Sequence, residues 1–463
     1  MSSVKAKWDS LSRRALSLAV AAIRHSGLLP KSFPDGLGDD KKLLGRTLNA
    51  EVVVYFADTI RGLYQLESWY PALQELHRTH RVVIFGTDSR CIKRIRQDSG
   101  LPAFTLTHYA TVDDLISRSP IRLVLYVNHN SGNFFMLRFP NLVHVSIMHG
   151  DSDKVVSISN QTKAYDFTFV AGQAAIDRLA DYLPMYDAAA RCVIVGRPQA
   201  DIGPGGPTGQ AAPAAAGGPS PGAPGASPVA TDGDPVPAAS NQPLAGGSRW
   251  RVLYAPTWEG GVPSSAYSSL EAYGPSIVQA LCGSDQFALT YRPHPLTGVR
   301  LPGYAAADHA LREAVAEAAA ADPAAGHRVS LGGRINADLA EADLLISDIS
   351  SLAIDFLPTT RPLLVTVPPD KGVVTAATRL LQAVPRLGQD QLAELAELVA
   401  EQIKVDPDRA KRLEATSYYL GDTTPGAATK SFVAACGQMI ELANQNRATI
   451  ATRLAHNSRD QAI

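Results

Sequence analysis

A chain of 463 residues is too long for one ordinary hydrophobic core, and a hydrophobic content of 45% is enough to build two. The formal net charge of −1 gives no overall field that would attract nucleic acid. The four cysteines lie far apart without a C-x-x-C pair, which argues against zinc ribbons and disulfide frameworks and is typical of a reducing cytoplasm. No segment approaches the ~20 apolar residues of a membrane span.

Residues 1–50 contain a basic segment with helical periodicity. Trp8, Leu11, Ala15, Leu18 and Ala22 recur at the spacing of one helix face. The segment lacks the A-x-A cleavage pattern of a signal peptide. Two interpretations stay open: a helix packed on the rest of the protein, and an amphipathic helix lying on an anionic membrane surface.

From residue 51 to residue 200, short apolar runs alternate with segments of helical period. The runs are continuous, as in strands that are buried on both faces of a parallel sheet. They predict strands at Val52–Phe56, Val82–Phe85, Phe104–Leu106, Leu123–Val127, Val143–Met148, Phe167–Val170 and Cys192–Val195, with a helix at Ala174–Leu183 among the connections. This alternation predicts a Rossmann-like domain.

Residues 201–249 are mostly Pro, Gly, Ala and Ser. Such a composition buries too little apolar surface to offset the entropy of ordering the chain, which predicts a disordered linker. A segment that binds a partner is the alternative.

The alternation resumes over residues 250–425. Strands are predicted at Val252–Tyr254, Phe287–Tyr291, Leu344–Ile346 and Leu363–Val367, and helices at Ala266–Leu281, His309–Ala320 and Leu392–Ile403. A last helix within residues 426–463, about Gly426–Asn444, is expected to reach back to the first domain. The predicted fold class is α/β, with two doubly wound, Rossmann-like domains facing a central cleft.

Several predicted strands end in polar groups that suit a phosphorylated ligand. His149 follows an apolar strand with Gly150 behind it, so its imidazole is open to a ligand and can accept a proton near neutral pH. Lys154 lies four residues further on and can meet a phosphate. The alternative for His149 is a structural histidine that bonds only to the backbone.

Arg292 and His294 stand in the stiff segment Arg-Pro-His-Pro, which ends the strand Phe287–Tyr291. A guanidinium binds phosphate oxygens through two parallel bonds, and an imidazolium adds another donor. An Arg292 that only pairs with a surface acid is the alternative.

Ser350 and Ser351 stand at the start of a predicted helix, where exposed N–H groups and hydroxyls can bind phosphate or simply cap the helix. Asp355, one turn later, can accept hydrogen bonds from ribose hydroxyls.

Thr257 follows another predicted strand and can donate a hydrogen bond to phosphate. In the first domain, Asn128, His129 and Asn133 suit a polyol acceptor, and equally suit a turn.

Several common motifs are missing from the sequence. It has no Walker A sequence, no G-x-G-x-x-G after a strand and no G-x-S-x-G elbow. It has no H-E-x-x-H or carboxylate cluster. Neither a cofactor nor a metal is therefore expected.

Together, His149-Gly150 with Lys154, Tyr254-Ala-Pro-Thr257, Arg292-Pro-His-Pro295 and Ser347-Asp-Ile-Ser-Ser351 resemble the CDP-glycerol glycerophosphotransferase family. These are the teichoic-acid polymerases and primases of bacterial cell envelopes, with a GT-B fold. The resemblance spans about residues 51–197 and 250–444. The chain has His-Gly-Asp-Ser at residues 149–152 where polymerases of the family usually have His-Gly-Thr-Pro, so Asp151 points to a different acceptor.

The resemblance implies a transferase that moves glycerophosphate, or a related phospho-polyol, from a CDP-activated donor to an envelope-polymer or lipid-linked acceptor, with release of CMP. It implies His149 as the general base, and Arg292, His294, Ser350 and Ser351 on the donor phosphates. It also implies a cytoplasmic protein in peripheral contact with the inner membrane leaflet. The alternatives are a GT-B glycosyltransferase that uses a nucleotide sugar, and a non-catalytic protein that binds nucleotide or polymer.

Overall fold

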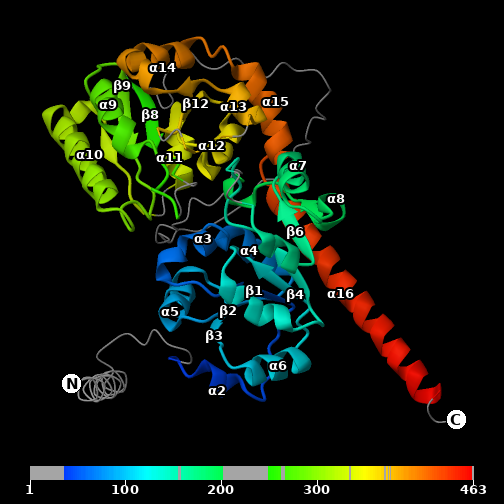
Figure 1. Cartoon of the computed structure of the whole chain (residues 1–463). Coiled ribbons are helices and arrows are strands. Elements are labelled where there is room, and N and C mark those ends of the chain that lie inside the picture. Colours follow the sequence, from blue (N-terminus) through cyan, green and yellow to red (C-terminus); the bar gives the residue numbers. More distant parts are fainter. Residues whose placement is uncertain are drawn as a thin grey trace, which may run out of the picture. The chain divides into compact units, whose positions relative to one another are not determined.

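The computed structural model describes residues 36–154, 158–201, 249–261, 266–332, 335–369, 372–373, 375 and 377–460. The helical segment expected before residue 36 and the linker expected at residues 202–248 lie outside these residues. The described residues form two compact units (Figure 1). Within the described ranges, the first unit comprises residues 36–151, 158–201 and 420–460, and the second comprises residues 152–154 and 249–419.

The first unit is built on a seven-stranded parallel sheet in the order β3-β2-β1-β4-β5-β6-β7. The strands are β1 (Val52–Phe56), β2 (Val82–Gly86), β3 (Ala103–Thr105), β4 (Leu123–Tyr126), β5 (Val143–Ser146), β6 (Phe167–Val170) and β7 (Cys192–Ile194). The helices are α2 (Asp39–Leu43), α3 (Tyr64–Glu67), α4 (Tyr70–Thr79), α5 (Ser89–Asp98), α6 (Tyr109–Arg118), α7 (Gln173–Tyr182), α8 (Ala188–Arg191) and α16 (Ala427–Asp460).

The second unit repeats this winding in a six-stranded parallel sheet, in the order β10-β9-β8-β11-β12-β13. Its strands are β8 (Trp250–Ala255), β9 (Phe287–Tyr291), β10 (Arg328–Val329), β11 (Leu344–Ser347), β12 (Leu363–Thr366) and β13 (Arg386–Leu387). Its helices are α9 (Leu270–Cys282), α10 (Pro302–Ala321), α11 (Ile335–Glu341), α12 (Ser351–Phe356), α13 (Arg379–Ala383), α14 (Leu395–Lys404) and α15 (Arg409–Leu420).

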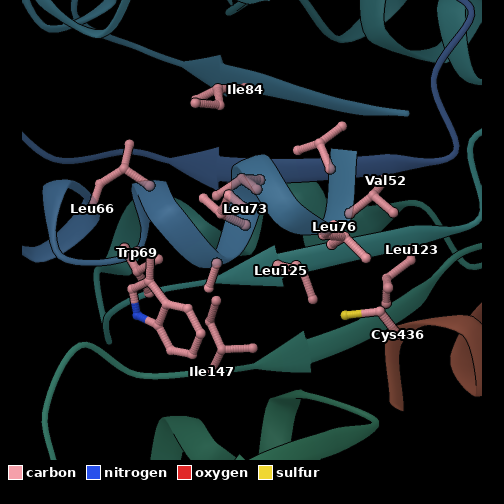
Figure 2. Close-up of a cluster of buried hydrophobic side chains, with 14 of the residues drawn as sticks. Val52, Leu66, Trp69, Leu73, Leu76, Ile84, Leu123, Leu125, Ile147 and Cys436 are labelled. Atoms are coloured by element: carbon pink, nitrogen blue, oxygen red, sulfur yellow. The ribbon is translucent and has the colours of Figure 1, made fainter. Parts of the chain in front are cut away.

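The central strands of the first unit are buried on both faces, as their continuous apolar runs predict. In β1, Val52 and Val54 belong to a core with α4, α5 and α16, whereas Val53 and Tyr55 belong to another core with α6. Figure 2 shows the first of these cores, in which Trp69 lies near Ile147 and Cys436 approaches from α16. Helices on both faces make the unit a doubly wound α/β structure.

Helix α16 closes the core of the first unit. Phe432 and Cys436 are fully buried in it. Asp201 accepts hydrogen bonds from the backbone N–H groups of Gly426 and Thr429, so a side chain from far upstream caps this helix. The chain thus returns after residue 419 to complete the first unit.

Some boundaries differ from the sequence-based prediction. Strand β5 ends at Ser146 rather than Met148, because Met148 has a φ of 43°, which no strand accommodates. Helix α10 starts seven residues earlier than predicted, with Pro302 in its first turn, a position that suits proline. The edge strands β10 and β13 have two residues each and leave no apolar run to detect.

Candidate functional site

Each sheet changes its winding direction between two neighbouring central strands, β1 and β4 in the first unit and β8 and β11 in the second. Ligands of open α/β sheets bind beyond the carboxyl ends of strands at such a point. In the second unit, Thr257 follows β8 and Asp348 follows β11, and the backbone N–H of Thr257 donates to Asp348 at 2.6 Å.

Asp348 is fully buried behind this strand edge. Its carboxylate also accepts from the N–H of Ser269 at 3.2 Å and from the hydroxyl of Thr366 at 2.6 Å. Burial raises the pKa of Asp348, while these hydrogen bonds act in the opposite direction. Its place and its partners show that Asp348 fixes the turns that follow β8 and β11.

Lys154 belongs to the second unit although its neighbours in sequence belong to the first. Its Nζ donates to the hydroxyl of Thr257 at 3.3 Å and lies 5.2 Å from the centre of the Tyr267 ring. Burial lowers the pKa of Lys154 to about 8, and the charge of Asp348 opposes that shift. The structure therefore brings together Lys154 and Thr257, which were identified as phosphate-binding candidates from distant motifs.

Arg292 follows β9 and is held by residues near β10 and α11. Its guanidinium donates to the hydroxyl of Ser330 at 3.1 Å, to Asp338 at 2.7 Å and to the carbonyl of Gly332. The Asp338 side chain has no exposed surface, so this is a buried ion pair rather than a pair with a surface acid. The contacts orient the guanidinium and partly balance its charge.

His294 is oriented by a hydrogen bond and by a ring contact. The N–H of Leu296 donates to its Nδ1 at 3.1 Å, so the neutral ring carries its proton on Nε2. The ring stacks on Trp258 at 6.2 Å between centres. An Nε2–H donor held in this way can bind a phosphate oxygen without a prior change of tautomer.

Ser350 is the N-cap residue of α12, and Ser351 is the first residue of the helix. The Ser350 hydroxyl makes no capping bond to the helix and instead lies 3.1 Å from the hydroxyl of Ser347. The capping alternative is therefore not what the Ser350 side chain does. Asp355 is half-buried on the same helix.

In the first unit, His149 lies on the turn beyond β5. Its Nδ1 donates to the carbonyl of Val127 at 3.3 Å, and its ring meets the Tyr64 ring edge-on at 5.9 Å. Burial, followed by the charge of Arg197, lowers the pKa of His149 to about 4. At neutral pH the ring is uncharged, and its Nε2 carries the lone pair that a general base needs.

The residues expected to meet an acceptor are largely engaged within the first unit. Asn128 donates to Gln65 at 2.6 Å and to Asp58 at 3.3 Å. Both N–H groups of the Asn133 amide are used, by the carbonyl of Asn128 at 2.7 Å and the hydroxyl of Tyr165 at 3.0 Å.

The other two acceptor candidates also have partners in the first unit. Asp151 pairs with Arg178 of α7. His129 lies 3.3 Å from the hydroxyl of Thr162, and burial lowers its pKa to about 4. Among these contacts, only the bond from Asn133 to the carbonyl of Asn128 is local to the turn, and the others reach different elements of the first unit.

Several residues around His149 and Asn128 were not predicted from the sequence. They are Asp58, Tyr64, Gln65, Trp69, Arg197 and Gln199. A polar residue after a predicted strand was the only available signal, and it applies to Asp58, which follows Val52–Phe56 closely, and to Arg197, which follows Cys192–Val195. The others come from helices or loops whose contacts span up to 79 residues.

Across the part of the chain that the structure describes, no three His, Cys, Asp or Glu side chains gather as metal ligands would. Among the described helices, none combines the length and the apolar character needed to cross a membrane.

The comparisons with known proteins bear on the fold and on the second unit. Residues 237–374 match the family model of CDP-Glycerol:Poly(glycerophosphate) glycerophosphotransferase. The solved structure of the wall teichoic acid polymerase TagF is similar with a TM-score of 0.50 and 13% identity, over 84% of this chain and 89% of that chain. A point variant of TagF gives a TM-score of 0.53 and 12% identity, over 88% and 92%. No curated protein sequence matches the chain.

The structural similarity shows a GT-B-like α/β fold with two parallel sheets. The matched segment contains Thr257, Arg292, His294, Ser350 and Ser351, which carried the resemblance seen in the sequence. Over residues 237–374 the chain thus carries the sequence pattern of the CDP-glycerol glycerophosphotransferase family, and that resemblance is confirmed.

Proposed function

We propose that this protein transfers glycerophosphate, or a related phospho-polyol unit, from a CDP-activated donor to a hydroxyl of an envelope polymer or lipid-linked acceptor. The observation that carries the proposal is the family match over residues 237–374, which covers the strand ends where Thr257, His294 and Ser350 lie. The acceptor would be met at the cytoplasmic face of the membrane, with the protein in peripheral contact with it.

The donor diphosphate is held by groups of the second unit. Lys154 supplies a positive charge beside Thr257, and His294 supplies an oriented Nε2–H. Arg292 adds donors from a guanidinium fixed by Asp338, and the Ser350 and Ser351 hydroxyls stand at the start of α12. These groups neutralise charge on the diphosphate and on the leaving CMP, while Asp355 is proposed to accept from the ribose.

His149 is the proposed general base. Its Nε2 takes the proton of an acceptor hydroxyl, and the acceptor oxygen attacks the phosphorus of the glycerophosphate unit. A new P–O bond to the acceptor forms as the P–O bond to CMP breaks, and CMP leaves with the electron pair. Asn128, His129, Asn133 and Asp151 remain the proposed acceptor side, with Asn128 next to the carboxylate of Asp58.

The test is an assay of CMP release from CDP-glycerol in the presence of crude bacterial membranes. We expect His149→Ala to abolish turnover and to leave the Kd for CDP-glycerol within about twofold, because the base acts on the acceptor and not on the donor. His309→Ala is the matched control, since His309 is an exposed histidine on α10 that pairs only along its own helix with Glu313.

The products separate the alternatives. Normal turnover by His149→Ala refutes the assignment of the base. Release of a nucleoside diphosphate from a nucleotide sugar would identify a glycosyltransferase instead. Binding of CDP-glycerol without any release, by the unaltered protein, would identify a non-catalytic binding protein.

A further inference from the structure

The turn that carries His149 is held by three side chains from distant parts of the first unit. The indole Nε1–H of Trp69 donates to the carbonyl of Met148 at 2.9 Å, and the amide of Gln199 donates to the same carbonyl at 3.3 Å. The guanidinium of Arg197 donates to the carbonyl of His149 at 2.9 Å. All three side chains are buried, with 1%, 7% and 8% exposure for Trp69, Gln199 and Arg197.

The backbone of this turn is in a conformation that needs such support. Met148 has a φ of 43°, in the left-handed region that residues with a side chain rarely adopt. A residue held there is strained, and this conformation persists only when the surroundings enforce it. The two hydrogen bonds to the Met148 carbonyl, from Trp69 and Gln199, stabilise this conformation and fix the direction of the backbone at His149.

Trp69 is itself fixed by the hydrophobic core. Its ring lies 5.1 Å from the ring of Phe432, on helix α16. It belongs to the core cluster drawn in Figure 2, where Ile147 also lies. The hydrogen bond from Trp69 therefore connects the His149 turn to a rigid part of the unit rather than to a loop.

The fixed backbone of the turn also determines the contacts of the imidazole ring. With the backbone fixed, the His149 Nδ1–H reaches the carbonyl of Val127, so Nε2 keeps its lone pair. The titratable and charged groups that face the ring are Tyr64, Arg197 and His129. Arg197 carries the positive charge among them that opposes protonation of the ring.

We propose that Trp69, Arg197 and Gln199 are positioning residues that together set the orientation of the His149 imidazole. Arg197 also disfavours the protonated ring through its positive charge. This inference rests on the proposed function, because it assigns these residues to the proposed base. None of the three is proposed to touch the reacting atoms.

Two measurements on the full-length protein test the inference. The first follows the His149 imidazole by NMR through a pH titration, identifies its signal from its loss in His149→Ala, and needs no activity. The second measures kcat and KM for CDP-glycerol by CMP release. Trp69→Phe keeps the ring against Phe432 and removes only the Nε1–H, whereas Arg197→Gln removes the charge.

For Trp69→Phe we expect kcat to fall about 10- to 100-fold with KM within about twofold, since a misplaced group costs catalysis and not binding. For Arg197→Gln we expect the His149 pKa to rise, and the acidic limb of the pH–rate profile to move to higher pH with it. Arg191→Gln is the matched control, because Arg191 also donates to backbone carbonyls of the first unit, at Lys163 and Asp166.

An unchanged kcat in Trp69→Phe, or an unchanged His149 pKa in Arg197→Gln, would overturn the inference. If Trp69→Phe does not fold, Gln199→Met removes the other donor to Met148 and is read in the same way. If His149→Ala keeps full turnover, the proposed base is wrong, and the NMR titration of Arg197→Gln still decides whether Arg197 controls the imidazole.

Discussion

Asp348 shows how one acidic residue can support a proposed phosphate site without facing the ligand. An acid facing the diphosphate would repel it, but this carboxylate is turned into the protein and accepts from Thr257, Ser269 and Thr366. Its negative charge also favours the ammonium form of Lys154. The acid beside the serines thus supports the donors instead of competing with the ligand.

The depressed pKa of Lys154 predicts a distinctive pH dependence for the proposed donor binding. Below a pKa of about 8 the side chain is charged and attracts the diphosphate; above it the free protein loses that charge, whereas the donor diphosphate stays ionised. We expect the Kd for CDP-glycerol to increase up to about tenfold from pH ~7 to pH ~9, because about a tenth of the side chains stay charged one unit above the pKa. Calorimetric titration at both pH values measures this.

The variant Lys154→Arg should remove the dependence, because a guanidinium stays charged throughout this range. Lys163→Arg, a change of the same kind in the first unit, should bind like the unaltered protein. A tenfold change that persists in Lys154→Arg would assign the pH dependence to another group.

Among the secondary-structure elements, the ends of strands were easier to predict than the residues that hold the His149 turn in place. Continuous apolar runs identified β1, β6, β9 and β11 to within a residue at each end, because strands buried on both faces need such runs. The polar residues that follow these apolar runs were then predicted to form the candidate site. The supports of His149 are Trp69, which is the N-cap residue of α4, and two residues from the segment after β7, and no local pattern reveals a bond across 79 residues.

Helix α16 depends on a cap supplied from residue 201. The Asp201 carboxylate receives the N–H of Gly426 at 2.6 Å and that of Thr429 at 2.8 Å. We expect Asp201→Ala to lower the free energy of unfolding of the first unit by about 1–2 kcal/mol, since it removes both capping bonds. Urea denaturation followed by circular dichroism measures the loss.

Asp187→Ala is the control, because it removes the cap of the four-residue helix α8. It should lower the free energy of unfolding by less than Asp201→Ala does. An equal decrease in the two variants would contradict the importance of the α16 cap.

At the scale of the whole molecule, the two units are interleaved along the chain. Residues 152–154 leave the first unit to join the second, and residues 420–460 leave the second to complete the first. The alternation of strands and helices predicted two Rossmann-like domains. It did not place Lys154 in the second of them, because the unit to which so short a segment belongs depends on tertiary contacts and not on composition.

This interleaving predicts that a destabilising change in α16 lowers the thermal stability of the first unit. Phe432 is fully buried against Trp69 in the first unit, and Phe287 is fully buried in the core of the second. Truncation of a buried phenylalanine costs about 3–5 kcal/mol, which for units of this size corresponds to a shift of about 10 °C in Tm. Scanning calorimetry should show Phe432→Ala lowering one unfolding transition and Phe287→Ala lowering the other. If Phe432→Ala lowered the transition that Phe287→Ala also lowers, α16 would not belong to the first unit alone.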